Sequence, residues 1–351
     1  MCPKGYFRGK KEKMKKLRVF EGFAGYGGAS FALRRANILH EVIGYSEILP
    51  KAIELYEMNH KGIKNFGDIR KIKPEELPDF DFFTGGFPCQ AFSSAGSNHG
   101  ELDTRGTLFY EIIRICEAKQ PEFILLENVK GLLSNKHRKT FNKIISELKR
   151  IGYNVVFELL NSRDYGVPQN RDRVWIFATK KNIPKNWSLA PKKEELKIFF
   201  KDLLEDNVDK KYYKNEQQTN RVIELTKVNM DVPEPLCLDI YNKWIRHDRI
   251  CMTITEPHHN TMRVVEPKKD GKFRMRKLTE KEHFRFMGFK DGEIEMGNMS
   301  YSQLCRAAGN GWEINVVTKI LNQIKRLIEL NEEGAPSVHK QKSMVEFLLA
   351  H

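Results

Sequence analysis

The feature that most constrains the fold is an alternation of strand-like and helix-like segments over residues 17–180 of the 351-residue chain. A β-like run at 17–23 ends in a glycine-rich turn and leads into a helix-like stretch at 29–36. Such an alternation is typical of an α/β domain, with a mostly parallel, doubly wound sheet and ligands at the carboxyl ends of the strands. Further strands are predicted at 42–46, 80–84, 123–126, 154–160 and 173–178, and further helices at 51–59, 108–118 and 139–150.

The alternation stops after residue 180. Residues 181–274 are rich in Lys, Asp, Glu and Asn, and we predict that they form a second, smaller domain. Residues 278–289 and 301–330 look helical again, the second with apolar side chains at three- and four-residue steps, typical of a helix packed on a core. We expect 275–330 to complete the first domain, and 1–16 and 331–351 to be tails.

Composition limits the classes of partner. The net charge is +14, and half of it lies in the first 18 residues, which hold eight Lys or Arg and one acid. That tail is either a solvated segment or an arm that binds nucleic acid. The chain has no apolar run long enough to span a membrane and no signal-peptide core, so we expect a cytoplasmic protein without a membrane partner. The six cysteines show no metal-binding spacing, so we predict reduced thiols and no metal site.

The glycine-rich turn at 23–28 could bring the backbone close to a ligand at the head of the next helix. Glu47 ends the second strand, where a carboxylate can accept hydrogen bonds from a ribose, and Asp68 follows a short predicted strand, where it could bind an adenine amino group. Each acid alone is most simply an ordinary surface carboxylate. At three successive strand ends, the turn and the two acids together favour an adenosyl cofactor.

Cys89 lies in a sharp turn, Gly86-Phe87-Pro88-Cys89, at the predicted ligand edge of the sheet. Most free cysteines are small apolar packing residues, but a thiol in this position is placed for nucleophilic attack. Glu127 ends the next predicted strand and could come close to that thiol. The pattern of residues alone leaves both interpretations of Cys89 open.

Several motifs resemble, in order and spacing, those of the cytosine-5 DNA methyltransferase family, in its small restriction-modification form. The central ones are Pro88-Cys89-Gln90, Glu127-Asn128-Val129 and the segment from Gln169 to Arg173. The resemblance extends to 23–28, 105–109, 276–289 and Gly309-Asn310. Two departures are Gly311-Trp312, where the family usually has Ser-Val, and Glu21-Gly22, where small or apolar residues are more usual.

The resemblance implies transfer of a methyl group from S-adenosylmethionine to C5 of a cytosine flipped out of duplex DNA. Cys89 would add to C6 of the base, and Glu127 would contact N3 and the exocyclic amine. Arg171 and Arg173 would hold the base O2 and flanking phosphates. The fold implied is a Rossmann-like methyltransferase domain carrying a smaller target-recognition domain.

The resemblance also implies two sets of binding residues. The cofactor pocket would be lined by Phe23, Gly25, Tyr26, Gly27, Gly28, Glu47, Asp68, Ile69, Pro88, Leu108 and Asn310. DNA contacts would come from Gln90, Ser93, Arg105 and Gln169, and in the middle domain from a polar cluster of Trp244, Arg246, Arg249 and Thr253.

We expect a monomer of bacterial or phage origin that acts on double-stranded DNA, with a cognate restriction endonuclease acting separately on the same site as a compatible partner. A related tRNA cytosine-5 methyltransferase would share Cys89, Glu127 and the glycine turn, and is the alternative. A catalytically silent nucleic-acid-binding homologue is disfavoured, because every reacting residue is present.

Overall fold

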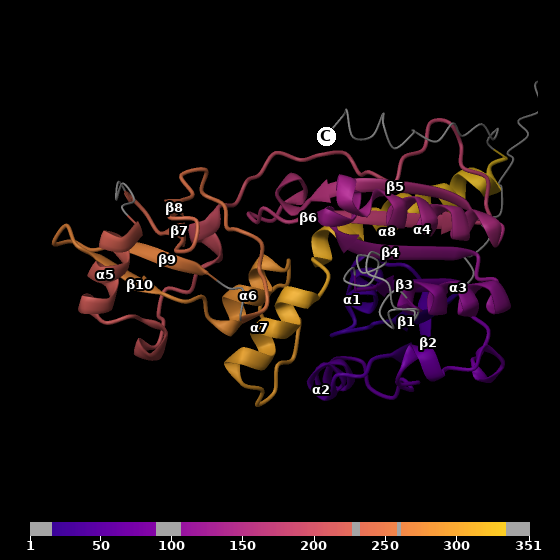
Figure 1. Ribbon diagram of the computed structural model, residues 1–351, viewed down its shortest axis with the longest axis horizontal. Coiled ribbons are helices and arrows are strands. Elements are labelled where there is room, and N and C mark those ends of the chain that lie inside the picture. The colour runs from indigo at the N-terminus through magenta and orange to yellow at the C-terminus, as the bar shows by residue number, and fades with distance from the viewer. Residues whose placement is uncertain (1–15, 89–106, 227–231, 258–260, 335–351) are drawn as a thin grey trace, which may run out of the picture.

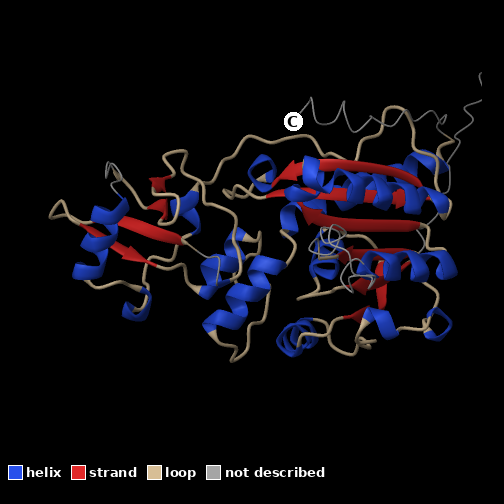
Figure 2. Cartoon of the chain, viewed as in Figure 1, coloured by secondary structure: helices blue, strands red, loops and turns tan. Residues whose placement is uncertain are grey.

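The computed structural model describes residues 16–88, 107–226, 232–257 and 261–334 (Figure 1). Within these ranges the strands form a six-stranded sheet and a smaller four-stranded sheet at the other end of the molecule (Figure 2). None of the helices in the described ranges is long and apolar enough to cross a membrane.

The larger sheet has the strand order β2-β1-β3-β4-β6-β5. Strands β1 (Leu17–Gly22), β2 (His40–Ser46), β3 (Phe82–Gly86) and β4 (Phe123–Val129) are parallel to one another. Strand β6 (Asp172–Thr179) is antiparallel to β4, and β5 (Asn154–Asn161) is antiparallel to β6. The prediction of an α/β fold with a mostly parallel sheet is therefore confirmed.

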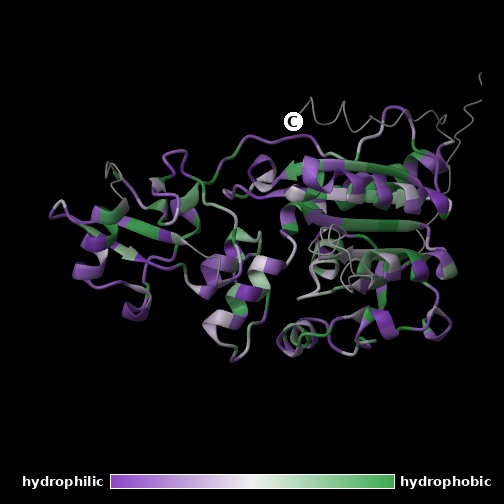
Figure 3. Ribbon diagram, in the orientation of Figure 1, coloured by the Kyte–Doolittle hydropathy of each residue, from purple (hydrophilic) through white to green (hydrophobic). Residues whose placement is uncertain are grey.

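Helices cover both faces of this sheet. Along β4, Phe123 and Leu125 pack into one hydrophobic cluster, whereas Ile124 and Leu126 pack into another, as expected for a strand buried on both sides. The first cluster includes α1 (Gly28–Arg35) and α8 (Ile314–Glu332), and the second includes α3 (Thr107–Lys119) and α4 (Arg138–Arg150). Helix α2 (Pro50–Asn59) lies near the β2 edge. Figure 3 shows the apolar strands between these more polar helices.

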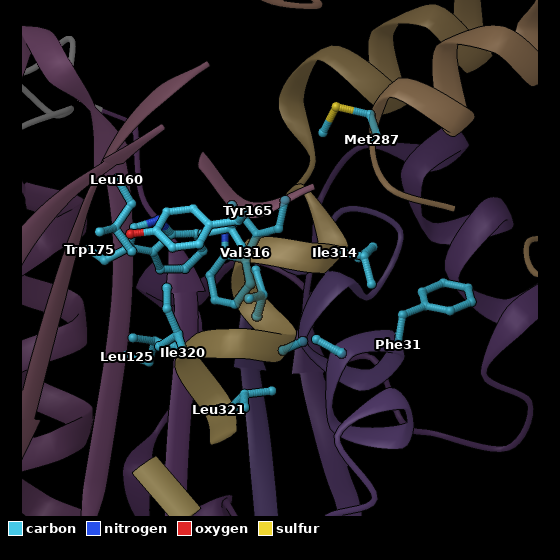
Figure 4. Close-up of a cluster of buried hydrophobic side chains, with 14 of the residues drawn as sticks. Phe31, Leu125, Leu160, Tyr165, Trp175, Met287, Ile314, Val316, Ile320 and Leu321 are labelled. Carbon is cyan, nitrogen blue, oxygen red and sulfur yellow. The ribbon is translucent and has the colours of Figure 1, made fainter. Parts of the chain in front are cut away.

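Helix α8 supplies much of the core on its face of the sheet. Its Val316, Ile320 and Leu321 lie in the same cluster as Trp175 of β6 and Leu125 of β4 (Figure 4). The prediction of one helix over 301–330 is wrong in one respect, because α7 (Tyr301–Asn310) ends before α8 begins. Gly311 is extended, and the Glu313 carboxylate caps α8 by accepting from the amides of Asn315 and Val316 at 2.7 and 3.0 Å.

The smaller sheet is antiparallel, in the order β10-β9-β7-β8. Its strands are β7 (Leu236–Asp239), β8 (Trp244–Ile245), β9 (Met262–Pro267) and β10 (Phe273–Arg276), and α5 (Glu216–Thr226) packs against it. Helices α6 (Glu280–Phe286) and α7 lie between the two sheets (Figure 1). The fully buried Arg276 joins β10 to α6 through Glu282, at 2.7 Å, and also pairs with Glu266 of β9.

Short 3-10 turns connect the longer elements: Ile69–Lys71, Pro74–Glu76, Lys130–Leu133, Asn135–His137, Ser162–Tyr165, Phe200–Leu203 and Lys210–Tyr212. The strand predicted before Asp68 is not formed. In that described segment Asn65 makes only an isolated bridge with Tyr45, and Asp68 instead caps the turn that follows it.

Candidate active site

The parallel strands bring the predicted site residues to one edge of the sheet. Gly22 lies opposite Ser46 and Gly85, and Gly86 lies opposite Glu127. Because β6 is antiparallel to β4, its first residues reach the same edge, where Arg173 lies opposite Val129. The glycine turn, Glu47, Pro88, Glu127 and Arg173 therefore gather along the carboxyl ends of β1 to β4, the usual ligand position of such sheets.

A cavity opens at this edge between the turn after β1, the end of β3 and the junction of α7 with α8. Five of the predicted cofactor residues border it: Phe23, Gly25, Tyr26, Gly28 and Asn310. The other lining residues are Glu21, Gly22, Ala24, Ala29, Thr84, Gly85, Gly86, Gly311 and Trp312. Segments almost 300 residues apart in the chain thus form its walls.

The glycine turn has an unusual backbone conformation. Phe23, Gly25 and Gly27 have φ angles of 53°, 56° and 81°, in the left-handed region that bulky residues such as phenylalanine rarely adopt. A Cβ atom on Gly27 would lie 2.3 Å from Nε2 of His60, so only glycine fits there. The Gly25 amide donates to Oε2 of Glu47 at 3.0 Å. The turn is therefore held in a conformation that exposes backbone groups to the cavity.

Glu47 links the turn to the head of α2. Its Oε1 accepts from the amides of Ile48 and Leu49 at 2.8 and 3.0 Å, so the orientation of the carboxylate is fixed. Asp68, by contrast, forms an ion pair with Arg70, and this hydrogen-bonded guanidinium lowers the pKa of Asp68. Asp68, the buried Ile69 and the half-buried Leu108 do not border the cavity described above.

Glu127 and Arg173 form an ion pair beside the cavity, with 2.7 Å between Oε1 and Nε. Both side chains are largely buried, with 12 and 15% of their surface exposed. A Cβ atom placed on Gly86 would lie 3.2 Å from the other carboxylate oxygen, Oε2. This oxygen therefore borders the end of β3, from which the chain continues to Pro88 and Cys89. An ion pair so enclosed holds its carboxylate in one orientation.

Asn128 is a site residue to which the sequence analysis assigned no role. Its side-chain amide donates to the Phe87 carbonyl at 2.9 Å, and its Oδ1 accepts from the Val129 amide. Asn128 is buried and holds the turn that leads into Cys89. The available signal in the sequence was the side-chain amide in the middle of the Glu127-Asn128-Val129 motif. Cys89, Gln90, Ser93 and Arg105 themselves lie outside the described residues.

Arg171 and Gln169 are buried, and their side chains bind groups within the protein. Arg171 is 2% exposed, and its guanidinium donates to the carbonyls of Ile254, Gly309 and Gly311 at 3.0, 3.1 and 2.8 Å. Burial lowers the pKa of Arg171 to about 9. Gln169 is fully buried and binds the Phe286 carbonyl and the Ile254 amide. In this structure the polar atoms of these two residues bind groups inside the protein, so both residues support the site.

Part of the polar cluster predicted to contact DNA from residues 181–274 is buried inside the protein. Arg246 is 5% exposed, pairs with Asp248 and lies 5.1 Å from the centre of the Trp244 ring. Arg249 pairs with Glu234 and stacks on Phe199, and the Thr253 hydroxyl donates to the Asn170 carbonyl at 2.7 Å.

Aromatic surface is exposed in the same region. Trp244 is 44% exposed, and Tyr241, in the turn between β7 and β8, is 78% exposed. Sequence reasoning missed Tyr241, although an aromatic residue in a polar turn was the available signal. These two rings are the large exposed aromatic surfaces on the described part of the smaller sheet.

Glu21 is a buried acid in the wall of the cavity. It is 2% exposed, accepts a short hydrogen bond from the Ser30 hydroxyl, and interacts with Arg34 and Tyr56. Burial raises the pKa of Glu21 from 4.5 to about 7. The folded protein therefore favours the protonated carboxyl, and the stability that this group contributes is present below about pH 4.5 and is lost as the pH rises through 7.

We expect Glu21→Gln to match the parent protein in stability at about pH 4 and to exceed it at about pH 8, by up to about 3 kcal/mol. Chemical denaturation of both proteins across this range measures the difference. Comparing the two removes the opposite contribution of His60, whose pKa burial lowers to about 4. A difference that does not change with pH would show that Glu21 is ionised in the folded state throughout.

Comparison with known proteins identifies the family of this chain. The family model for C-5 cytosine-specific DNA methylase matches residues 17–326. The type II methyltransferase M2.ScrFI of Lactococcus lactis subsp. cremoris is 32% identical, over 88% of this chain and 99% of its own length. M.HaeII of Haemophilus aegyptius is 34% identical over 88% of this chain and 92% of its own length. The orphan methyltransferase M.SPRI of Bacillus phage SPR is 39% identical, over 60% of this chain and 55% of its own length.

Solved structures show the same fold. The crystal structure of a DNMT2 mutant of Spodoptera frugiperda superposes with a TM-score of 0.71 at 20% identity, covering 88% of this chain and all of the other. The structure of a putative DNA modification methyltransferase encoded within a prophage of E. coli superposes with a TM-score of 0.66 at 20% identity, covering 90% of this chain and all of the other. The chain therefore has the same fold as these two proteins. The chain belongs to the C-5 cytosine-specific DNA methylase family and is a DNA cytosine-5 methyltransferase.

Proposed function

We propose that this enzyme transfers a methyl group from S-adenosylmethionine to C5 of a cytosine flipped out of duplex DNA, through a covalent bond between Cys89 and C6. The observation that carries the proposal is the convergence at the end of β3. The carboxylate of the Glu127–Arg173 pair and the cavity-lining Trp312 both border Gly86, and three residues later the chain reaches Cys89.

The residues present fit an adenosyl cofactor. The turn from Phe23 to Gly28 leaves backbone exposed to the cavity, and side chains on Gly27 or Gly86 would meet other atoms at 2.3 and 2.9 Å. Glu47, held by the turn and by α2, is the group that would bind the ribose hydroxyls. When bound, S-adenosylmethionine supplies an electrophilic methyl group. Asn310 would approach it from α7.

Each of the chain's own groups then has one task. The Cys89 thiolate adds to C6 of the base, and the ring electrons move toward N3 and onto C5. Glu127, oriented by Arg173, shares a proton with N3 and accepts a hydrogen bond from the exocyclic amine, and so limits the charge that develops on the ring. After C5 has taken the methyl group, loss of the C5 proton and departure of the Cys89 thiolate restore the aromatic ring.

Flipping is required because stacked bases hide both faces of the cytosine ring. We propose that residues 181–274 select the target site in the DNA, with Tyr241 and Trp244 as exposed aromatic contacts. The relatives include both type II and orphan methyltransferases, so they do not decide whether a restriction endonuclease accompanies this enzyme. We therefore propose only methyl transfer by the enzyme itself, with duplex DNA as its partner.

The test is to incubate the purified enzyme with labelled S-adenosylmethionine and a plasmid library, and to map methylcytosine by conversion sequencing. A parallel reaction contains a tRNA pool. We expect C5 methylation at one short sequence in DNA, and its complete loss in Cys89→Ala with duplex binding retained. Methyl transfer to tRNA alone would replace the proposal with the RNA alternative, and activity of Cys89→Ala would exclude the covalent step.

A further inference from the structure

Trp312 departs from the family's usual sequence and lies in the wall of the cofactor cavity. It follows Gly311 in the extended junction between α7 and α8, and it is 8% exposed. A tryptophan at such a junction is a large side chain where the related motif usually carries a small one. Its volume must therefore be accommodated by the cavity itself.

Three contacts fix the position of this residue, one through its backbone and two through its side chain. The carbonyl of Trp312 accepts a short hydrogen bond from the buried Tyr26 hydroxyl. The indole packs edge to face with Trp175, with ring centroids 5.0 Å apart and an interplanar angle of 75°. A Cβ atom placed on Gly28 would lie 3.0 Å from Cβ of Trp312, so α1 begins directly against it. The indole is therefore part of the rigid wall.

The pyrrole edge of the indole lies beside the group that would hold the base. A Cβ atom placed on Gly86 would lie 2.9 Å from Nε1 of Trp312 and 3.2 Å from Oε2 of Glu127. The indole and the carboxylate thus border the same small space at the end of β3. Glycine at position 86 leaves this space open, because any side chain there would fill it.

We propose that Trp312 determines the size of the group that this enzyme transfers, by restricting the space between cofactor and base to a methyl group. The inference rests on the proposed function, since the group must pass from the cofactor cavity to a base held by Glu127. Phe23, Tyr26 and Trp312 are the bulky residues in the described cavity wall, and Trp312 is the one among the nearest neighbours of Gly86. A longer alkyl group would collide with the indole, which its contacts prevent from moving.

The first test measures binding, without turnover. Calorimetry gives the dissociation constants of S-adenosylmethionine and of its analogue with an allyl group in place of methyl, for the parent enzyme and for Trp312→Leu and Trp312→Ala. We expect the parent to prefer the methyl compound and both variants to shift the ratio toward the allyl compound by at least about tenfold, a typical value for added carbon atoms in a closed pocket. Trp312→Leu retains part of the volume if the alanine variant fails to fold.

The second test uses fluorescence. Binding of S-adenosylhomocysteine should change the tryptophan emission, and Trp312→Phe should remove most of that change. The matched control is Trp187→Phe, because Trp187 is also buried but donates to the Gln323 carbonyl, away from the cavity. The control should retain the change.

The outcomes separate this inference from the proposed function. An allyl-to-methyl ratio that is the same in the parent and in Trp312→Leu would overturn the role of Trp312, whether or not DNA is methylated. A shifted ratio in an enzyme that methylates no DNA would support the role of Trp312 while contradicting the proposed function. In an active enzyme, DNA alkylation by the allyl compound should increase in Trp312→Leu relative to methylation.

Discussion

Replacing Glu127 by glutamine is expected to lower the rate of methyl transfer by about 10²- to 10⁴-fold, the usual contribution of a positioned acid or base. The carboxylate is held by Arg173 at 2.7 Å and borders the end of β3, where the base would lie. Glutamine keeps the size of the side chain but removes its charge, so the ion pair and the contact with N3 and the amine are both weakened. Single-turnover transfer of labelled methyl groups to duplex DNA measures the rate.

The control for this prediction is Glu75→Gln, which changes the net charge equally at an exposed position that does not border the cavity. It should leave the rate unchanged. The dissociation constant of Glu127→Gln for duplex DNA, measured separately, should stay within a few fold of the parent value, because the substitution slows methyl transfer and not binding. A variant with parental turnover would show that Glu127 only supports the fold.

The second large effect is expected on stability. Arg171→Met should lower the free energy of unfolding by about 3 kcal/mol or more, because the carbonyls of Ile254, Gly309 and Gly311 lose a buried donor together. Arg171→Lys keeps the charge but not the forked geometry, so its free energy of unfolding should lie between those of Arg171→Met and the parent. Urea denaturation monitored by circular dichroism measures both.

Arg171→Met should also weaken binding of S-adenosylhomocysteine, because Arg171 holds the carbonyl of Gly311, which is part of the cavity wall. Arg326→Met is the matched control, because Arg326 is 52% exposed and its ion pairs on the surface of α8 contribute little. If Arg171→Met were as stable as this control and bound the cofactor product equally well, the proposed support of the cavity by Arg171 would be excluded.

Much of the architecture could be predicted from local patterns. Apolar runs and glycine turns predicted the order of strands and helices in residues 17–180, because their hydrophobic periodicity directly reflects burial on both faces of a sheet. The family motifs placed Glu127 and the glycine turn at strand ends, and parallel pairing brought those ends to one edge. The break between α7 and α8 was missed, since the extended conformation of Gly311 depends on the buried Tyr26 ring against it.

Residue roles within the motifs required the tertiary structure. Arg171 and Arg173 are two residues apart in one basic segment, and nothing local distinguishes them. In the structure Arg173 pairs with Glu127, whereas Arg171 binds carbonyls that lie more than 80 residues away in the chain. The same holds for Arg246, which is buried beside Asp248.

The sequence by itself determined the class of fold, the family and the order of the chemical groups, because these depend on periodicity and on motifs read along the chain. Only the tertiary structure decided which polar side chains face the site and which are used to hold distant segments together. The position of Trp312 between Gly28, Gly86 and Trp175 belongs to the second group. The reason is physical: a side chain's partners are chosen by packing between segments remote in sequence, which no local pattern encodes.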